Sequence, residues 1–99
     1  MNSLNSSFDY IINHSLNKFD CLKQLSQIIY NDIFSAVYNG NYEYLNKISI
    51  IMNEKIKIID DNNSLSLTLN YNILKNILIN IFELKSPMIN LDLLQSIIN

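Results

Sequence analysis

The only histidine and the only cysteine of this 99-residue chain are the side chains best suited to catalysis. His14 and Cys21 could form a thiol–imidazole pair, in which the imidazole activates the thiol as a nucleophile. They lie seven residues apart with a predicted helix boundary between them, and no third group that would orient the imidazole is visible. His14 is also five residues from Asp9, outside the three- or four-residue spacing of helical neighbours. We expect a surface His14 and a buried, unreactive Cys21.

Oxygen-bearing side chains cluster in the run Asp-Asp-Asn-Asn-Ser at residues 60–64. A calcium loop needs alternating oxygen ligands, a central glycine and a terminal glutamate, and this run lacks that pattern. We interpret the run as a solvated turn. The single glycine of the chain also rules out a glycine-rich phosphate loop. The sequence therefore predicts no metal, no cofactor and no enzymatic activity.

Aromatic side chains gather near the middle of the chain. Such a cluster can stack the bases of single-stranded nucleic acid, but that mode needs a positive groove, and only two lysines lie nearby. Tyrosine joins an apolar ring to a polar hydroxyl, which suits contacts between proteins. We therefore predict a partner interface made of Tyr30, Phe34, Tyr38, Tyr42 and Tyr44.

Charge and composition narrow the class of protein further. The chain has no arginine, and seven lysines against nine acidic residues give a net charge of −2, so direct binding to nucleic acid is not expected. Hydrophobic residues make up 48%, which is too many for a disordered chain. One cysteine permits no disulfide within the chain and fits an intracellular, cytoplasmic or nuclear location. We find no secretory signal and no apolar run of about 18 residues that would span a membrane.

Helices must position these residues, because one glycine and one proline are too few for the turns of a sandwich or barrel. Isoleucine occurs 18 times and asparagine 17 times, a skew typical of an AT-rich genome, so periodicity is a better guide here than propensity. Apolar residues recur at helical spacing in five segments. We predict an all-α, compact four- to five-helix bundle that forms a single domain over residues 1–99.

The first three predicted helices cover about 7–17, 20–38 and 42–59. In the first, Ser6 or Ser7 is the expected cap, Asp9 lies in the first turn, and Leu16 belongs to the buried face. Asn39-Gly40 is the clearest stop signal, since glycine accepts the left-handed conformation after a helix. Asn41 is the expected cap of the third helix.

The last two predicted helices run from residue 68 or 70 to 85 and from 90 to 99. Ile73 and Leu84 belong to the apolar stripe of the fourth, and Ser86-Pro87 ends it. Asn90 is the expected cap of the fifth, with Asp92 in its first turn. Residues 65–69 alternate like a strand, but no partner strand is evident, so we predict an extended connector.

The last thirty residues show a long apolar helix, a short break, and a start to a final helix at residues 89–94 in which Ile89, Leu91 and Leu94 follow a Leu-x-Leu-x-x-Leu spacing. This pattern resembles the end of the collar domain of clamp-loader subunits, the family of the replication factor C small subunits and the DNA polymerase III delta-prime and gamma subunits. Residues 13–20 resemble its joint between the first and second helices, and residues 27–33 its second helix. Residues 39–42 fit the same joint equally well. The chain lacks the arginine and glycine common near the penultimate break, and the ATPase domains that precede a collar.

The resemblance implies an oligomerisation domain that holds clamp-loader subunits in a ring, without ATPase activity. Its partners would be clamp-loader ATPase subunits or further copies of the chain. An alternative is a free-standing small bundle that binds and neutralises a partner, similar to bacteriocin immunity proteins. A helical adaptor within a larger assembly and a small enzyme with His14 as base are the other hypotheses.

Overall fold

Five helices account for most of the chain in the computed structural model, which describes residues 2–99, with side chains described for Leu4 and residues 6–99. They are α1 (Asn2–His14), α2 (Lys18–Tyr38), α3 (Tyr42–Asp61), α4 (Leu69–Phe82) and α5 (Pro87–Ile98). No strand occurs in residues 2–99, so the predicted all-α bundle is confirmed. Its radius of gyration is 12.7 Å, close to the ~13 Å typical of a chain of this length.

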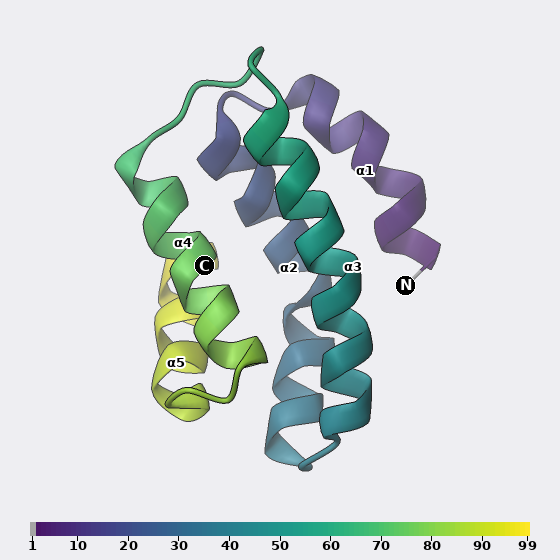
Figure 1. The fold of residues 1–99 in the computed structure, drawn as a ribbon, viewed down its shortest axis with the longest axis vertical. Coiled ribbons are helices and arrows are strands. Elements are labelled where there is room, and N and C mark those ends of the chain that lie inside the picture. The colour runs from purple at the N-terminus through teal and green to yellow at the C-terminus, as the bar shows by residue number, and fades with distance from the viewer. Residues whose placement is uncertain (1) are drawn as a thin grey trace.

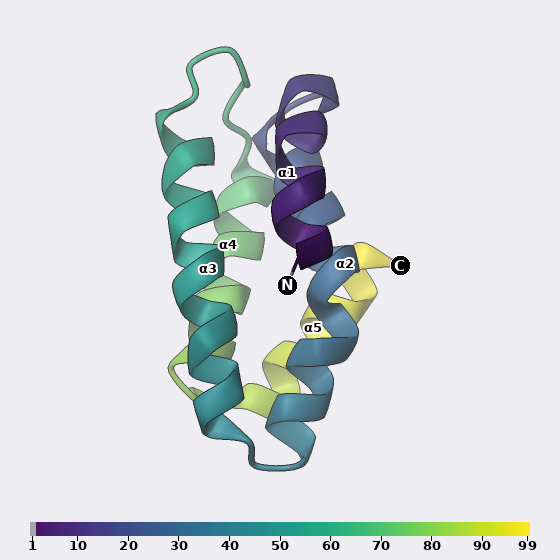
Figure 2. The same ribbon diagram turned by 90° about the vertical axis from the view of Figure 1, so that its right-hand side faces the viewer.

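The second helix is the centre of the arrangement, because α2 packs against each of the other four. Figures 1 and 2 show α3 antiparallel to α2, and α4 and α5 forming a second antiparallel hairpin. The α4–α5 hairpin lies on the opposite side of the bundle from α1 (Figure 1). The long α2 therefore packs against the other helices, and one of its faces is left exposed to solvent.

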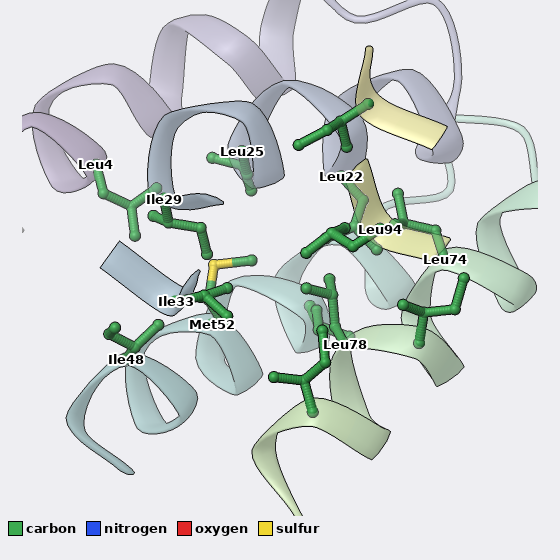
Figure 3. Close-up of a cluster of buried hydrophobic side chains, with 14 of the residues drawn as sticks. Leu4, Leu22, Leu25, Ile29, Ile33, Ile48, Met52, Leu74, Leu78 and Leu94 are labelled. Atoms are coloured by element: carbon green, nitrogen blue, oxygen red, sulfur yellow. The ribbon is translucent and has the colours of Figure 1, made fainter. Parts of the chain in front are cut away.

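The core consists mostly of aliphatic side chains, and all five helices contribute to it. Figure 3 shows side chains from α2 and α3 meeting those from the α4–α5 hairpin, with Leu4 reaching in from α1. Burying one such leucine or isoleucine stabilises the fold by about 1.5–3 kcal/mol relative to leaving it exposed. Completely buried members include Leu22, Leu25, Ile33, Ile48, Met52, Leu74, Leu78 and Leu94.

The α2–α3 turn forms where the sequence predicts it. Gly40 has a φ of +66°, and the Asn41 N–H donates to the carbonyl of Ala36 at 2.8 Å. These are the features of a Schellman ending, which satisfies carbonyls that the last turn of a helix leaves free. The Asn41 side chain then accepts from the Tyr44 N–H, so it caps α3 as expected.

The α4–α5 turn repeats this geometry without glycine. The Lys85 N–H donates to the Asn80 carbonyl at 2.8 Å, and Leu84 occupies the left-handed position with a φ of +58°. The prediction that α4 continues to Lys85 with Leu84 on its buried stripe is wrong, because α4 ends at Phe82 and Leu84 is exposed. Leucine pays a steric cost in this conformation that glycine does not.

The start of α5 also differs from the prediction. The helix begins at Pro87, which suits a first helical position because proline has no N–H to leave unpaired. Asn90 is not the cap but is buried inside the helix, and its side-chain amide donates to the carbonyls of Lys85 and Ser86 at 3.0 Å each. Asp92 consequently lies beyond the first turn.

The first helix begins earlier than predicted and ends earlier. Because α1 starts at Asn2, Asp9 is in its middle and neither Ser6 nor Ser7 is its cap. Leu16 lies beyond the helix and is 86% exposed, so its predicted place on the buried face is wrong. The Leu16 N–H instead donates to the Asp20 carboxylate at 2.9 Å, in the turn that starts α2.

Between α3 and α4, Asn63 and Ser64 form a turn, Leu65 is a bend, and residues 66–68 have no regular secondary structure and no ladder to another segment in residues 2–99. The predicted connector covers residues 65–69, but Leu69 is already the first residue of α4. Leu65 is buried while Leu67 is exposed. The connector is tied to the start of α2, where the Lys18 N–H donates to the Ser66 carbonyl at 3.0 Å. The Thr68 hydroxyl accepts from the Tyr71 N–H and caps α4.

Candidate functional site

Three aromatic residues form a continuous ladder along α2. Tyr30, Phe34 and Tyr38 are four residues apart, which places them one above another on a helix. The ring centroids of Tyr30 and Phe34 are 6.2 Å apart, and those of Phe34 and Tyr38 are 5.3 Å apart in a stacked arrangement. We call these three residues the aromatic ladder.

The aromatic ladder changes from buried to exposed along its length. Tyr30 is partly buried and packs against the core, whereas Phe34 is 40% exposed and Tyr38 is 67% exposed. The adjacent face of α2 supplies Ile29 and Ile33 to the core, which fixes the orientation of the helix. The two outer rings therefore face solvent from a helix that cannot rotate without breaking the core.

The surroundings of the ladder carry little charge. Between Gln24 and Glu43 the only charged residue is Asp32. Burial raises the pKa of the Tyr30 hydroxyl, and the negative charge of Asp92 on α5 raises it further. The Tyr30 hydroxyl therefore remains protonated at physiological pH.

The other two tyrosines of the predicted interface lie elsewhere. Tyr42 is exposed at the first residue of α3, just after the turn. Tyr44 is partly buried and packs against the core. Burial raises the pKa of its hydroxyl, as do the charge of Asp32 on α2 and a hydrogen bond to it. Tyr44 thus takes part in holding α3 against α2.

His14 and Cys21 do not form a catalytic pair. His14 is exposed, its ring stacks on Tyr10 with centroids 4.0 Å apart, and its Nδ1 atom is 2.8 Å from the Tyr10 carbonyl oxygen. Cys21 is completely buried, as expected. Burial raises the pKa of its thiol, a hydrogen bond with Ser15 lowers it, and the charge of Asp20 raises it. A thiol in this setting stays protonated and is a poor nucleophile.

The acidic run at residues 60–64 proves to be more than a solvated turn. Asp60 and Asp61 belong to α3, and the helix ends only after them. The Asp60 carboxylate accepts from the Tyr71 hydroxyl at 2.5 Å and pairs with the Lys75 ammonium at 3.2 Å. The Asp60 carbonyl accepts from the Lys18 ammonium at 2.6 Å. We call these four residues, from three helices, the Asp60 cluster.

The Asp60 cluster ties α2, α3 and α4 together through hydrogen bonds and an ion pair. Burial raises the pKa of the completely buried Tyr71 well above its ordinary value near 10, and the hydrogen bond and charge of Asp60 act in the same direction. A hydroxyl with a raised pKa stays protonated at neutral pH, so Tyr71 acts here as a hydrogen-bond donor to Asp60. The cluster closes the α3–α4 connector against α2, where Lys18 contributes its backbone as well as its side chain.

Other kinds of site find little support in the described part of the chain. Residues 2–99 contain no group of three or more histidine, cysteine, aspartate or glutamate side chains that could hold a metal ion. None of the five helices is long and apolar enough to cross a membrane. A shallow pocket of about 210 Å³ lies where α2, α4 and α5 meet, lined by Phe19, Asn70, Ile73 and Ile97. It is smaller than the ~300–1000 Å³ of ordinary small-molecule sites.

One surface escaped the sequence prediction. Ile73, expected in the core, is 45% exposed, and Ile89 and Leu93 on α5 are exposed as well. The signal was present in the sequence, because α4 and α5 each contain a single charged residue. Uniformly apolar helices in a small bundle must leave some apolar residues outside.

Comparison with known proteins assigns neither a family nor a function to this chain. No protein-family model, no curated protein and no solved structure matches this chain. The resemblance to the clamp-loader collar is therefore neither supported nor contradicted by relatives, and the surfaces described above are the basis for function.

Proposed function

We propose that this chain is a non-catalytic helical domain that binds another protein through the aromatic ladder. The observation that carries the proposal is the row of Tyr30, Phe34 and Tyr38 on a fixed helix, in which the Phe34 and Tyr38 rings are stacked and lie in solvent. Aromatic rings held in place lose little entropy on binding and are enriched at the energetically important positions of interfaces.

A protein suits this surface better than a nucleic acid. Stacking of nucleic-acid bases requires a positive groove that follows the backbone. The nearest charges along the chain around the ladder are acidic, Asp32 and Glu43, and the negative charge of Asp92 on α5 raises the pKa of Tyr30. A complementary partner presents apolar side chains to Phe34 and Tyr38 and hydrogen-bond donors or basic groups at the rim.

The resemblance to the collar gives this proposal a specific form, an oligomerisation domain of a clamp loader in an intracellular compartment. Its support is the arrangement of the last two helices, with a four-residue break between α4 and α5 and with Leu91 and Leu94 buried. The alternative form is a free-standing bundle that neutralises a partner. Both forms use a protein surface and no catalytic residue.

Affinity capture from an extract of the source cells tests the proposal. The bait is the tagged chain in four versions: wild type, Phe34→Asp, Tyr38→Asp and the control Tyr10→Asp. Tyr10 and Tyr38 are matched, since they are 66% and 67% exposed, but Tyr10 lies on α1. Circular dichroism first establishes that all four versions are equally helical.

The expected result is a stoichiometric partner that wild type and Tyr10→Asp retain and that both ladder variants lose. Clamp-loader ATPase subunits among the captured proteins would support the collar form, and a toxin would support the neutralising form. A partner that binds all four versions equally, or the absence of any stoichiometric partner, would contradict the role of the ladder.

A further inference from the structure

The turn between α2 and α3 contains the only Asn-Gly pair of the chain, at Asn39 and Gly40. Both residues are exposed, and the space around Gly40 is open, since a Cβ added there would meet no atom within 4 Å. An asparagine followed by glycine is a reactive combination, because the backbone nitrogen of a residue without a Cβ can attack the asparagine side chain unhindered. The turn therefore holds a reactive pair in addition to ending α2.

The reaction open to this pair is deamidation, in which water is the only co-reactant. The Gly40 nitrogen gives its proton to solvent and bonds to the Asn39 Cγ atom. The bond from Cγ to the side-chain nitrogen then breaks, and ammonia leaves with a proton taken back from solvent. Water opens the resulting cyclic imide at either carbonyl and leaves aspartate or isoaspartate, so one water is consumed, one ammonia is released and no electron is transferred.

In the folded turn, the two reacting groups are held apart. Ring closure requires the Gly40 nitrogen to eclipse the Asn39 Cβ, which lies about 120° around the Cα–C bond from the Asn39 nitrogen. The Asn39 ψ of 1° places the Gly40 nitrogen over the Asn39 nitrogen instead. The side-chain amide that must be attacked donates to the Ser35 hydroxyl at 3.2 Å. The folded backbone thus prevents the attack until the Asn39 ψ rotates.

Hydrogen bonds of the turn oppose that rotation. The Gly40 N–H donates to the Val37 carbonyl at 3.2 Å, and the Asn41 N–H donates to the Ala36 carbonyl at 2.8 Å. A rotation about the Asn39 ψ moves both donors away from α2, so both bonds must break before the ring can close. The reaction therefore requires an open form of the turn.

From this geometry we infer that Asn39 is the residue at which this chain deamidates, and that local opening of the α2–α3 turn sets the rate. The turn lies at one end of the bundle (Figures 1 and 2), and residues 38–43 are all exposed. Opening there exposes little additional apolar surface, so it costs less free energy than separation of the core.

The product changes both the charge and the backbone of the turn. A carboxylate at residue 39 adds a negative charge at the C-terminal end of α2, where the free carbonyls disfavour an anion. Isoaspartate also adds a methylene group to the main chain, which displaces the Asn41 N–H from the Ala36 carbonyl. The modified residue adjoins Tyr38, so deamidation adds charge at the exposed end of the aromatic ladder, whether or not that surface binds a protein.

Peptide mapping by mass spectrometry tests the inference after incubation at mildly alkaline pH, in buffer and in urea above the unfolding transition. Asn63 is the internal control, because it is exposed but is followed by Ser64, whose Cβ hinders the attack. In urea, Asn39 should be modified before Asn63 and every other asparagine, and Asn39→Gln should abolish this fast phase. In buffer, modification of Asn39 should be at least ~10-fold slower than in urea.

Two cap variants distinguish local opening from global unfolding. The Asn41 side chain accepts from the Tyr44 N–H at 3.2 Å beside the turn, and the Thr68 hydroxyl accepts from the Tyr71 N–H at 3.3 Å at the start of α4. Asn41→Ala and Thr68→Ala should lower global stability to a similar extent, but only the first loosens the α2–α3 turn. In buffer, Asn41→Ala should accelerate deamidation of Asn39 roughly 3- to 30-fold, and Thr68→Ala should change it less than about twofold.

In urea, wild type and both cap variants should react at the same rate, because no turn remains to be opened. Circular dichroism verifies that all of them are folded in buffer. Earlier modification of another asparagine in urea would overturn the assignment of Asn39. Equal rates for Asn39 in buffer and in urea, or equal effects of the two cap variants in buffer, would overturn control by the turn.

Discussion

Two residues end their helices in the same left-handed conformation, yet one is glycine and the other is leucine. Gly40 has a φ of +66° and Leu84 a φ of +58°, and both lie in Schellman turns. The first could be located from the sequence, because glycine marks such positions. The second could not, because leucine favours continuing the helix and only the packing of α5 forces the chain to turn.

Substitutions at these two positions should have unequal effects. Gly40→Ala should lower the free energy of unfolding by about 1 kcal/mol through backbone strain alone, since an added Cβ meets no atom within 4 Å. Leu84→Gly should be neutral or stabilising by up to about 1 kcal/mol, because relief of strain offsets the loss of a half-exposed side chain. Urea titration of both variants measures the difference. Equal destabilisation by the two would show that the turn at Leu84 is not strained.

A second prediction for a single residue concerns the hydroxyl of Tyr71. Tyr71→Phe keeps the buried ring and removes only the hydrogen bond to Asp60. The loss should be about 1–2 kcal/mol, because the acceptor is charged but half-exposed and can bind water instead. Asp61→Asn, one residue along, is the control and should change the free energy of unfolding by less than about 0.5 kcal/mol.

The same hydroxyl sets a limit on stability at high pH. Burial and Asp60 raise the pKa of Tyr71 in the folded chain above the ordinary value near 10. The fold therefore favours the protonated form, and this contribution is complete below pH 10 and is lost as pH rises above it. Unfolding free energies measured between pH 8 and 11 should fall more steeply for wild type than for Tyr71→Phe. Parallel curves would contradict this assignment.

Among the elements, α1 shows how far periodicity could predict the fold. The spacing of Phe8 and Ile11 identifies a helix there, and both are buried. Its true start was hidden because the asparagine- and serine-rich first residues carry no helical signal of their own. Its end was hidden because Leu16 continues the spacing by chance, while Asn17 and Asp20 impose the next cap.

The packing of α1 predicts unequal effects of substitutions at Phe8 and at Leu16. Phe8 is 5% exposed and lies beneath the Lys55 ammonium, 4.8 Å from its ring centroid. Phe8→Ala should therefore cost about 3 kcal/mol or more, and Leu16→Ala less than about 0.5 kcal/mol. Chemical denaturation followed by circular dichroism compares them. A similar loss for both would place Leu16 in the core after all.

At the scale of the whole molecule, the number of helices could be predicted but the outer surface could not. Five apolar stripes are enough to predict five helices, and each helix was found. Which of the clustered aromatics share a face depends on how α3 rotates against α2. Thus Tyr44 turns toward Asp32 while Tyr38 remains in solvent. The exposure of Ile73 likewise follows from the position of α5, which spacing within α4 does not specify.

Finally, complete burial of the only thiol makes Cys21 an internal reporter of local opening. A thiol reagent in solution can reach its sulfur only when the segments packed around it separate, so the modification rate measures that opening. Comparing this rate with global unfolding distinguishes a bundle that opens part by part from one that unfolds as a single unit. The chain supplies this measurement without any added label, because no second cysteine competes for the reagent.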